Sequence, residues 1–147
     1  MSKFLLFFVL GLFTLSSCKK DPKTFKIGDE NLGGVVIQTD GSGEHGLVAA
    51  KSDQLAVNPG KNYAQSEAVV SNYTEGGNGW RMPSKDELVL IYNNKSKLGS
   101  FNSWYYWSST KVDGGINHFT VNFNNGECKG NCSVGNYSFC SRAVKDF

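Results

Sequence analysis

Short segments with strand or helix periodicity follow one another over residues 32–147. Alternating or β-branched runs predict strands, whose residue ranges are 35–39, 46–50, 105–110, 118–123 and 137–144. Apolar positions at helical spacing predict a helix within 62–73. Ser84 and Glu87 form a capping box ahead of a second helix. The order of strands, helices and strands predicts an α+β domain.

The hydrophobic run at residues 4–13 differs from these segments, because it lacks a polar face and lies at the very start of the sequence. At about 1.5 Å of rise per residue it is too short to cross a hydrocarbon core of about 30 Å. Lys3 before the run and small residues after it are typical of a signal peptide. The segment Leu15-Ser16-Ser17-Cys18 has the form of a bacterial lipobox, in which the cysteine sulfur accepts a diacylglyceryl group. We therefore expect a lipoprotein signal peptide at 1–17 and lipidation of Cys18.

Residues 18–31 are polar and charged, which predicts a lipid anchor followed by a tether. Two or three acyl chains such as palmitate, at about 0.8 kcal/mol for each buried methylene, would hold the protein on its membrane. Lys19, Lys20 and Asp21 resemble the charged surface-export signals of Bacteroidetes lipoproteins, and they fit a solvated linker beside lipid head groups equally well. The expected location is the bacterial cell envelope, at the outer membrane, with exposure on the cell surface left open.

Composition narrows the class of protein. The 147 residues carry a formal net charge of +2, and this balance argues against a nucleic-acid partner, which would require a concentrated basic face. The 17 glycines and 13% aromatic residues suit a turn-rich, largely β domain. Of the 4 cysteines, Cys18 is assigned to the lipid. Cys128, Cys132 and Cys140 remain, and an odd number outside the cytoplasm predicts one disulfide and one free thiol.

Five sequence motifs occur in an order that resembles a known family. They are Gly34-Val35-Val36 with 45–50, Trp80-Arg81-Met82-Pro83 before a Ser-x-x-Glu-Leu helix, 106–110, 121–123 and 142–145. Together they resemble the Fibrobacter succinogenes major paralogous domain, which is related to the C-terminal domain of the Legionella collagen-like adhesin. The resemblance implies a C-type-lectin-like fold over 32–147, shared with formylglycine-generating enzymes, in which two helices pack on a small twisted antiparallel sheet. It also implies a bacterial surface or secreted protein, and the best-described relatives bind sulfated polysaccharides and glycosaminoglycans.

The same resemblance bears on the cysteines. Cys132 and Cys140 resemble the final two cysteines of a lectin domain, whose partner in the first helix is missing here. The expectation is therefore a Cys128–Cys132 disulfide across the turn at 129–131, with Cys140 buried and unpaired. Such a disulfide requires Cα atoms within about 7 Å. A remote enzymatic alternative is a pair of thiols at Cys128 and Cys132 that holds copper, as in formylglycine-generating enzymes.

Candidate ligand-binding residues surround the aromatic segment 104–107. Strand alternation would send Trp104 and Tyr106 to one face and Tyr105 and Trp107 to the other, so one pair is expected in the core. Trp104 and Tyr105 are nearer the preceding loop and are the candidates for stacking on a sugar ring. The alternative is that all four aromatic residues are structural.

Three further residues are candidates for ligand contact. His118 stands where relatives usually carry an aromatic residue, which indicates either a different ligand or a packing substitution. Lys97 and Lys111 flank the long polar loop and would form a modest basic rim for an anionic glycan, or else a plain solvated surface.

Other chemistry finds little support in the sequence. Two histidines without an H-x-x-x-H or C-x-x-C pair argue against zinc, and the calcium-binding tripeptides of C-type lectins are missing. The sequence has no Ser/His/Asp arrangement. We therefore expect no catalytic residue, no metal and no cofactor. The expected function is a lipid-anchored, non-catalytic envelope module that binds a polysaccharide. The alternative is a protein-interaction or structural subunit of an envelope complex.

Overall fold

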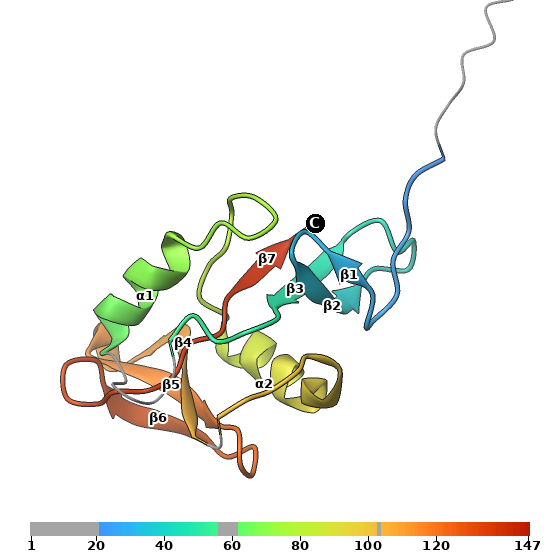
Figure 1. Ribbon diagram of the computed structural model, residues 1–147. Helices are drawn as coiled ribbons and strands as arrows, with labels where there is room; N and C mark the ends of the chain where they lie inside the picture. Colours follow the sequence, from blue (N-terminus) through green and yellow to red (C-terminus); the bar gives the residue numbers. More distant parts are fainter. Residues whose placement is uncertain (1–20, 56–61, 103) are drawn as a thin grey trace, which may run out of the picture.

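The computed structural model describes residues 21–55, 62–102 and 104–147. Within these residues the α+β class is confirmed, since two α-helices accompany two small antiparallel sheets with strand orders β1-β2-β3-β7 and β4-β5-β6 (Figure 1). The elements in chain order are β1 (Glu30–Asn31), β2 (Gly34–Thr39), β3 (Gly46–Ala50), α1 (Tyr63–Ser71), α2 (Lys85–Asn93), a 3-10 turn η1 (Lys95–Lys97), β4 (Tyr105–Val112), a second 3-10 turn η2 (Asp113–Gly115), β5 (Asn117–Asn122), β6 (Cys128–Ser133) and β7 (Val144–Asp146). The expectation of one sheet that carries both helices is corrected to two sheets.

The first sheet joins the beginning and the end of the domain. β2 forms because Val35, Val36 and Ile37 are β-branched and buried, with Val36 in one hydrophobic cluster and its two neighbours in the other. β3 returns antiparallel to it, with Val48 opposite Val36, and β7 pairs along the other edge of β3. Both strands predicted for this region are confirmed.

Both predicted helices are present, and each begins at a capping box. In α2 the backbone N–H of Glu87 donates to Ser84 Oγ at 3.2 Å, and the N–H of Ser84 donates to the Glu87 carboxylate at 2.8 Å, as predicted. Asn62 and Gln65 exchange the same two hydrogen bonds in α1, at 3.0 and 3.3 Å. Each box satisfies N–H groups that the first helical turn leaves without an intrahelical partner.

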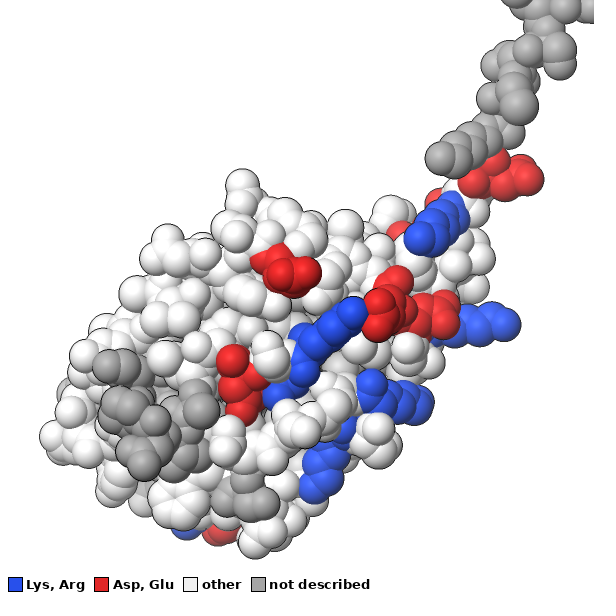
Figure 2. Space-filling view, in the orientation of Figure 1, with Lys and Arg blue, Asp and Glu red and all other residues white. Residues whose placement is uncertain are grey.

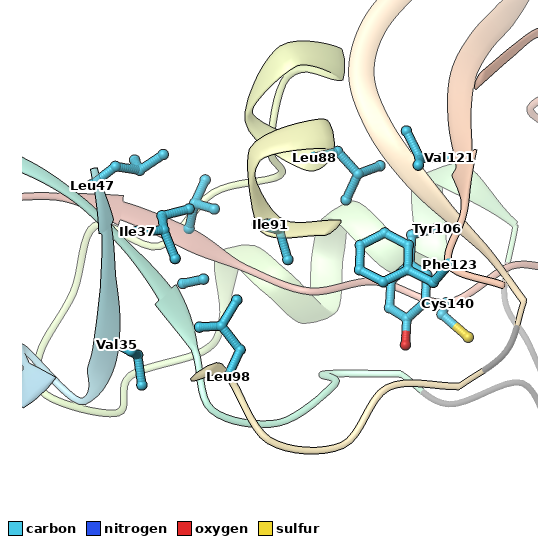
Figure 3. Packing of buried hydrophobic residues seen from close by; sticks show 12 residues of the cluster. Val35, Ile37, Leu47, Leu88, Ile91, Leu98, Tyr106, Val121, Phe123 and Cys140 are labelled. Atoms are coloured by element: carbon cyan, nitrogen blue, oxygen red, sulfur yellow. The ribbon is translucent and has the colours of Figure 1, made fainter. Parts of the chain in front are cut away.

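The central core lies where α2 packs between the two sheets. Leu88 and Ile91 are fully buried and lie between the side chains of the first sheet and those of the second (Figure 3). Their neighbours in this cluster include Val35, Ile37, Leu47 and Val144 from the first sheet and Tyr106 and Val121 from the second. Full burial of such a side chain contributes about 1.5–3 kcal/mol, so α2 is a major link between the sheets.

A second cluster contains side chains from α1, from β4 and from the first sheet. Trp107 and Trp80 are 0% and 4% exposed, so both belong to the core. Tyr63 of α1 meets the Trp107 ring edge-on, with ring centroids 5.9 Å apart. The predicted alternation is also visible here, because Trp107 and Tyr105 belong to this cluster whereas Tyr106 packs in the cluster around α2.

The second sheet differs from the prediction at its third strand. β4 and β5 confirm the two strands expected first in this region. The strand expected at 137–144 is wrong, because that segment makes isolated bridges, such as Cys140 with Tyr106, and regular pairing begins at Val144. The third strand is β6, where a turn at 129–131 was expected. As an edge strand β6 buries Cys132 and keeps its other side chains exposed or half-buried, so it lacks a hydrophobic pattern.

Part of the predicted tether belongs to the fold. The backbone N–H of Phe25 donates to Gly43 O at 2.8 Å, and the Phe25 ring meets Phe147 edge-on with centroids 5.2 Å apart. Glu30–Asn31 then form β1 beside β2. The folded region therefore begins earlier than residue 32, the boundary predicted from sequence.

The expected signal peptide at 1–17 and the expected lipidation at Cys18 lie outside the described residues, and both stay predictions. No helix in the described ranges combines the length and the apolar character needed to cross a membrane. On the face drawn in Figure 2, acidic and basic side chains stand side by side along the half nearest the N-terminal segment, and few lie over α1.

Candidate functional site

The aromatic groove is a hollow of about 400 Å³ beside the second sheet. Its lining residues are Trp104, Tyr105, Lys129, Asn131, Cys132, Tyr137 and Phe139. Trp104 and Tyr137 are 44% and 46% exposed, which makes them the most open aromatic side chains in the described part of the chain. Large aromatic residues are usually buried, so two of them open to solvent in one hollow indicate a binding surface.

Segments far apart in the sequence form this groove. Trp104 directly precedes β4, and its backbone carbonyl accepts a hydrogen bond from the N–H of Phe123 at 2.8 Å. Tyr137 belongs to the segment that follows β6. That segment is fixed to β4 because the N–H of Cys140 donates to Tyr105 O at 3.0 Å. Main-chain hydrogen bonds therefore hold both aromatic segments.

The aromatic rings form a continuous series. Trp104 and Tyr105 meet edge-on with centroids 5.9 Å apart, and Tyr105 lies 5.3 Å from Phe139. Phe139 then stacks on Tyr137, at 5.5 Å and an angle of 12° between the ring planes. Phe139 is buried, so the two open rings at the ends of the series rest on packed neighbours. Such packing fixes ring orientation before any ligand arrives.

A small polar cluster completes the groove. Lys129 Nζ lies 4.9 Å from the centroid of the Tyr105 ring and 3.7 Å from the Glu127 carboxylate. A hydrogen bond with Tyr105 and the charge of Glu127 raise the pKa of Lys129 above its usual value. Asn131 is exposed and offers both a donor and an acceptor. Cys132 is buried, with its Sγ 3.4 Å from Thr120 Oγ1.

No protein-family model matches this chain. A comparison with curated proteins also gives no match. The case for function therefore depends on the geometry of the groove.

Trp104 and Tyr105, the two aromatic ligand candidates from the sequence, both line the groove. Their partners Tyr137, Phe139, Lys129 and Asn131 were not foreseen. The sequence does contain a signal for two of them, since the spacing Tyr137-x-Phe139 places both rings on one side of an extended segment. That signal was attributed to a regular strand, and the proximity of Tyr137 to Trp104 depends on the bridge between Cys140 and β4.

The structure places His118 in the core and not at the surface. It is 2% exposed, its Nδ1 lies 2.9 Å from Ser108 O, and its ring centroid is 3.8 Å from that of Tyr63. A bulge after His118 in the pairing of β5 with β6 accompanies this inward orientation. The packing alternative is therefore correct, and His118 is removed from the set of ligand contacts.

Lys97 and Lys111 are exposed, but neither lines the groove. Lys97 lies in η1, with its Nζ 3.5 Å from Asn94 Oδ1. Lys111 lies toward the other end of β4, six positions from Tyr105 and thus about 20 Å away along the strand. The expected basic rim around the aromatic residues is therefore corrected, because these two side chains do not gather there.

The cysteines are free thiols in this structure, and the expected Cys128–Cys132 disulfide is corrected. Both residues lie in β6, where Cys128 pairs with Val121 and Cys132 with His118. They are four positions apart in β6 across a bulge, and their partners on β5 are three positions apart, so the two cysteines are separated by about 10 Å, beyond the reach of a disulfide of about 7 Å. The same separation removes the two-thiol arrangement on which the copper alternative was based. Cys140 is buried and unpaired, as expected.

A buried polar network supports the loop that leads to Trp104. The guanidinium of Arg142 is fully buried, lies 2.7 Å from the Asp53 carboxylate and donates to the Ser100 carbonyl at 2.7 Å. Asp53 also accepts a hydrogen bond from Asn102 Nδ2 at 2.8 Å and one from Tyr106 O–H at 2.7 Å. Burial and the nearby charge of Asp53 raise the pKa of Tyr106. The network therefore fixes residues 100 and 102, directly before the groove.

Two other hollows lie beside β2 and are less suited to a ligand. They measure about 270 and 360 Å³ and share Gln38, Thr39 and Glu87. Arg81 donates to both Glu87 carboxylate oxygens at 2.8 Å and also pairs with Asp146, so these carboxylates already have a partner. Across the described residues, no cluster of three or more His, Cys, Asp or Glu side chains is placed to hold a metal ion.

Proposed function

We propose that this protein is a lipid-anchored, non-catalytic binding module of the bacterial cell envelope, with a C-type-lectin-like fold and a saccharide site in the aromatic groove. The supporting observation is that the open rings of Trp104 and Tyr137 share one hollow with Lys129 and Asn131. Sugar rings combine C–H faces, which pack on aromatic rings, with hydroxyl groups, which need donors and acceptors. Apolar walls with a few polar groups are typical of ligand sites.

The saccharide site is tested with the full protein, extracted from membranes in detergent and applied to a glycan array. Binding is expected, with a loss in Trp104→Ala and Tyr137→Ala. Ile116→Ala is the matched control, because Ile116 is 69% exposed and does not line the groove. If no glycan binds and a photo-crosslinker at position 137 captures an envelope protein instead, the protein-interaction function replaces this proposal.

The membrane anchor is tested separately. The hydrophobic run at 4–13 and the lipobox at 15–18 support transfer of a diacylglyceryl group to Cys18. Radiolabelled palmitate is expected to enter the wild-type protein and not the Cys18→Ala variant. Mass spectrometry that finds an unmodified Cys18 in protein from native membranes would rule out the anchor. Protease treatment of intact cells then distinguishes surface exposure from an inward-facing location.

A further inference from the structure

We propose that the aromatic groove selects an uncharged polysaccharide, with hexopyranose rings that present a face of axial C–H bonds, over a sulfated or otherwise acidic one. This inference depends on the proposed saccharide function and specifies its ligand class. It runs against the sulfated ligands that the family resemblance implies, and it is based on the charges and rings around the groove.

The charges around the groove disfavour an acidic ligand. Among the described residues that line the groove, Lys129 is the charged one, and its ammonium group already lies 3.7 Å from the Glu127 carboxylate. The Glu127 carboxylate is also 3.5 Å from the Tyr105 hydroxyl, so it stands at the edge of the groove. A sulfate group that approached Lys129 would meet this carboxylate as well, and like charges at close range oppose binding.

The basic residues Lys97 and Lys111 do not extend the charge of the groove. An anionic polymer is usually held by several Lys or Arg side chains on one surface. Lys111 lies about 20 Å along β4 from Tyr105, and Lys97 lies in η1 after α2. Neither side chain lines the groove, so neither adds to the single charge of Lys129.

The groups in and beside the groove fit a neutral sugar. Exposed indole and phenol faces at Trp104 and Tyr137 match the C–H face of a pyranose ring. A carboxylate accepts hydrogen bonds from sugar hydroxyls, an ammonium group donates to them and an amide does both. Glu127, Lys129 and Asn131 supply these three kinds of group within one short segment.

The test uses the full protein in detergent and matched probes. Laminarin, cellohexaose and β-1,4-galactan are the uncharged set, and laminarin sulfate, heparin and polygalacturonate are the acidic set. At least one uncharged probe is expected to bind about tenfold or more tightly than every acidic probe. Its affinity is expected to stay within about twofold between about 0.05 M and about 0.5 M NaCl, because no counterions are displaced.

Two variants sharpen the result. Glu127→Gln is expected to weaken binding of the uncharged probe by about threefold to tenfold, because a charged hydrogen-bond acceptor is lost. The same variant is expected to bind laminarin sulfate more tightly. Lys111→Ala is the control and is expected to change neither probe. Tight, salt-sensitive binding of acidic probes that is lost in Trp104→Ala overturns the ligand class and leaves the saccharide function intact. Failure of both probe sets overturns the saccharide function itself.

Discussion

The Arg142 network and the aromatic groove combine the same kinds of group and differ in hydration. In the network, a fully buried guanidinium lies 2.7 Å from Asp53 and 3.9 Å from the centroid of the Phe101 ring. In the groove, the Lys129 ammonium lies 3.7 Å from Glu127 and 4.9 Å from the Tyr105 ring, and its side chain is 41% exposed. The same three kinds of group, a cation, a carboxylate and an aromatic ring, therefore form a structural contact where they are buried. Where they are exposed to solvent, they form an accessible surface.

Because of this difference, the residues that stabilise the fold are not the residues that are free to bind a ligand. Water screens the groove, so its ion pair contributes little to stability and can exchange partners with a ligand. The network is buried, so removal of either charge leaves the other without a partner and away from bulk solvent. Substitutions should therefore affect stability at one site and affinity at the other.

The largest effect is expected from Arg142→Leu. This change leaves the Asp53 carboxylate, whose side chain is 9% exposed, without its buried counter-ion. The free energy of unfolding should fall by about 3–5 kcal/mol. Chemical denaturation measures it, with Arg81→Leu as the control, because Arg81 is 40% exposed and should cost about 1 kcal/mol or less. Equal losses in the two variants would contradict the comparison.

The next largest effect is expected in the alkylation rates of Cys128, which is exposed, and Cys140, which is buried. Burial and the charge of Asp53 raise the pKa of Cys140 to about 12, so its thiolate is scarce at neutral pH. Cys128 is exposed. Alkylation of Cys128 should therefore be about a thousandfold faster than that of Cys140, as measured by mass spectrometry of peptides after timed labelling.

The same labelling experiment checks the corrected disulfide. In native protein without reductant, Cys128 should react at once, and Cys132 and Cys140 should react after denaturation. Cys128 that becomes reactive only with a reductant would show that a disulfide forms. Cys140 that labels as fast as Cys128 would contradict the burial of the network.

Substitution in the groove should change affinity more than stability. Trp104→Ala removes an indole that is 44% exposed, so its truncation costs less packing than that of a core tryptophan. The affinity for the best saccharide in the array should fall about tenfold or more, whereas the free energy of unfolding should change by about 1 kcal/mol or less. Calorimetric titration and denaturation of one preparation measure both. A loss of stability that exceeds the loss of binding energy would make Trp104 a structural residue.

The sequence predicted the elements whose residue types carry a local signal. The β-branched Val35, Val36 and Ile37 identified β2, and the pairing of Ser84 with Glu87 identified the start of α2. β6 was missed because its sequence, Cys-Lys-Gly-Asn-Cys-Ser, has neither a β-branched run nor an alternation of apolar and polar residues. Its Gly130 has a tertiary reason instead, since a Cβ there would lie 2.9 Å from the Phe119 ring.

The candidate site was predicted only in part, because some of its residues carry a local sequence signal and others do not. Trp104 and Tyr105 were found because they stand at the start of an aromatic strand. Tyr137 reaches them because its segment makes an isolated bridge to β4 at Cys140, and such a bridge leaves no periodic signal in the sequence. The Asp53–Arg142 contact joins positions 89 residues apart, and neither residue has a local pattern that indicates its partner. Long-range pairing of polar groups was therefore the main part of the structure that the sequence did not reveal.

The smallest expected effect concerns the Arg81–Glu87 pair. Its side chains are more exposed than those of Arg142 and Asp53 and less exposed than those of Lys129 and Glu127. Burial alone would raise the pKa of Glu87, but hydrogen bonds from Arg81 and Ser84 outweigh it and hold the pKa below its usual value. A carboxyl group with a lowered pKa in the folded state stabilises the protein above its unfolded pKa, and that contribution is lost as the pH falls through the folded value. Glu87→Gln should therefore cost about 0.5–1 kcal/mol at pH 7, a modest amount because Arg81 is partly exposed to screening water.

The pH dependence distinguishes this electrostatic cost from a packing cost. Denaturation curves between pH 7 and about pH 2.5 should show the gap between wild type and Glu87→Gln closing below about pH 4. Glu44→Gln, an exposed carboxylate in the turn before β3, is the control and should show no gap at any pH. A gap that persists in acid would mean that Glu87 acts through the uncharged geometry of its capping box. The Arg81–Glu87 ion pair would then contribute nothing measurable to stability, and the expected order of the three ion pairs by exposure would be wrong.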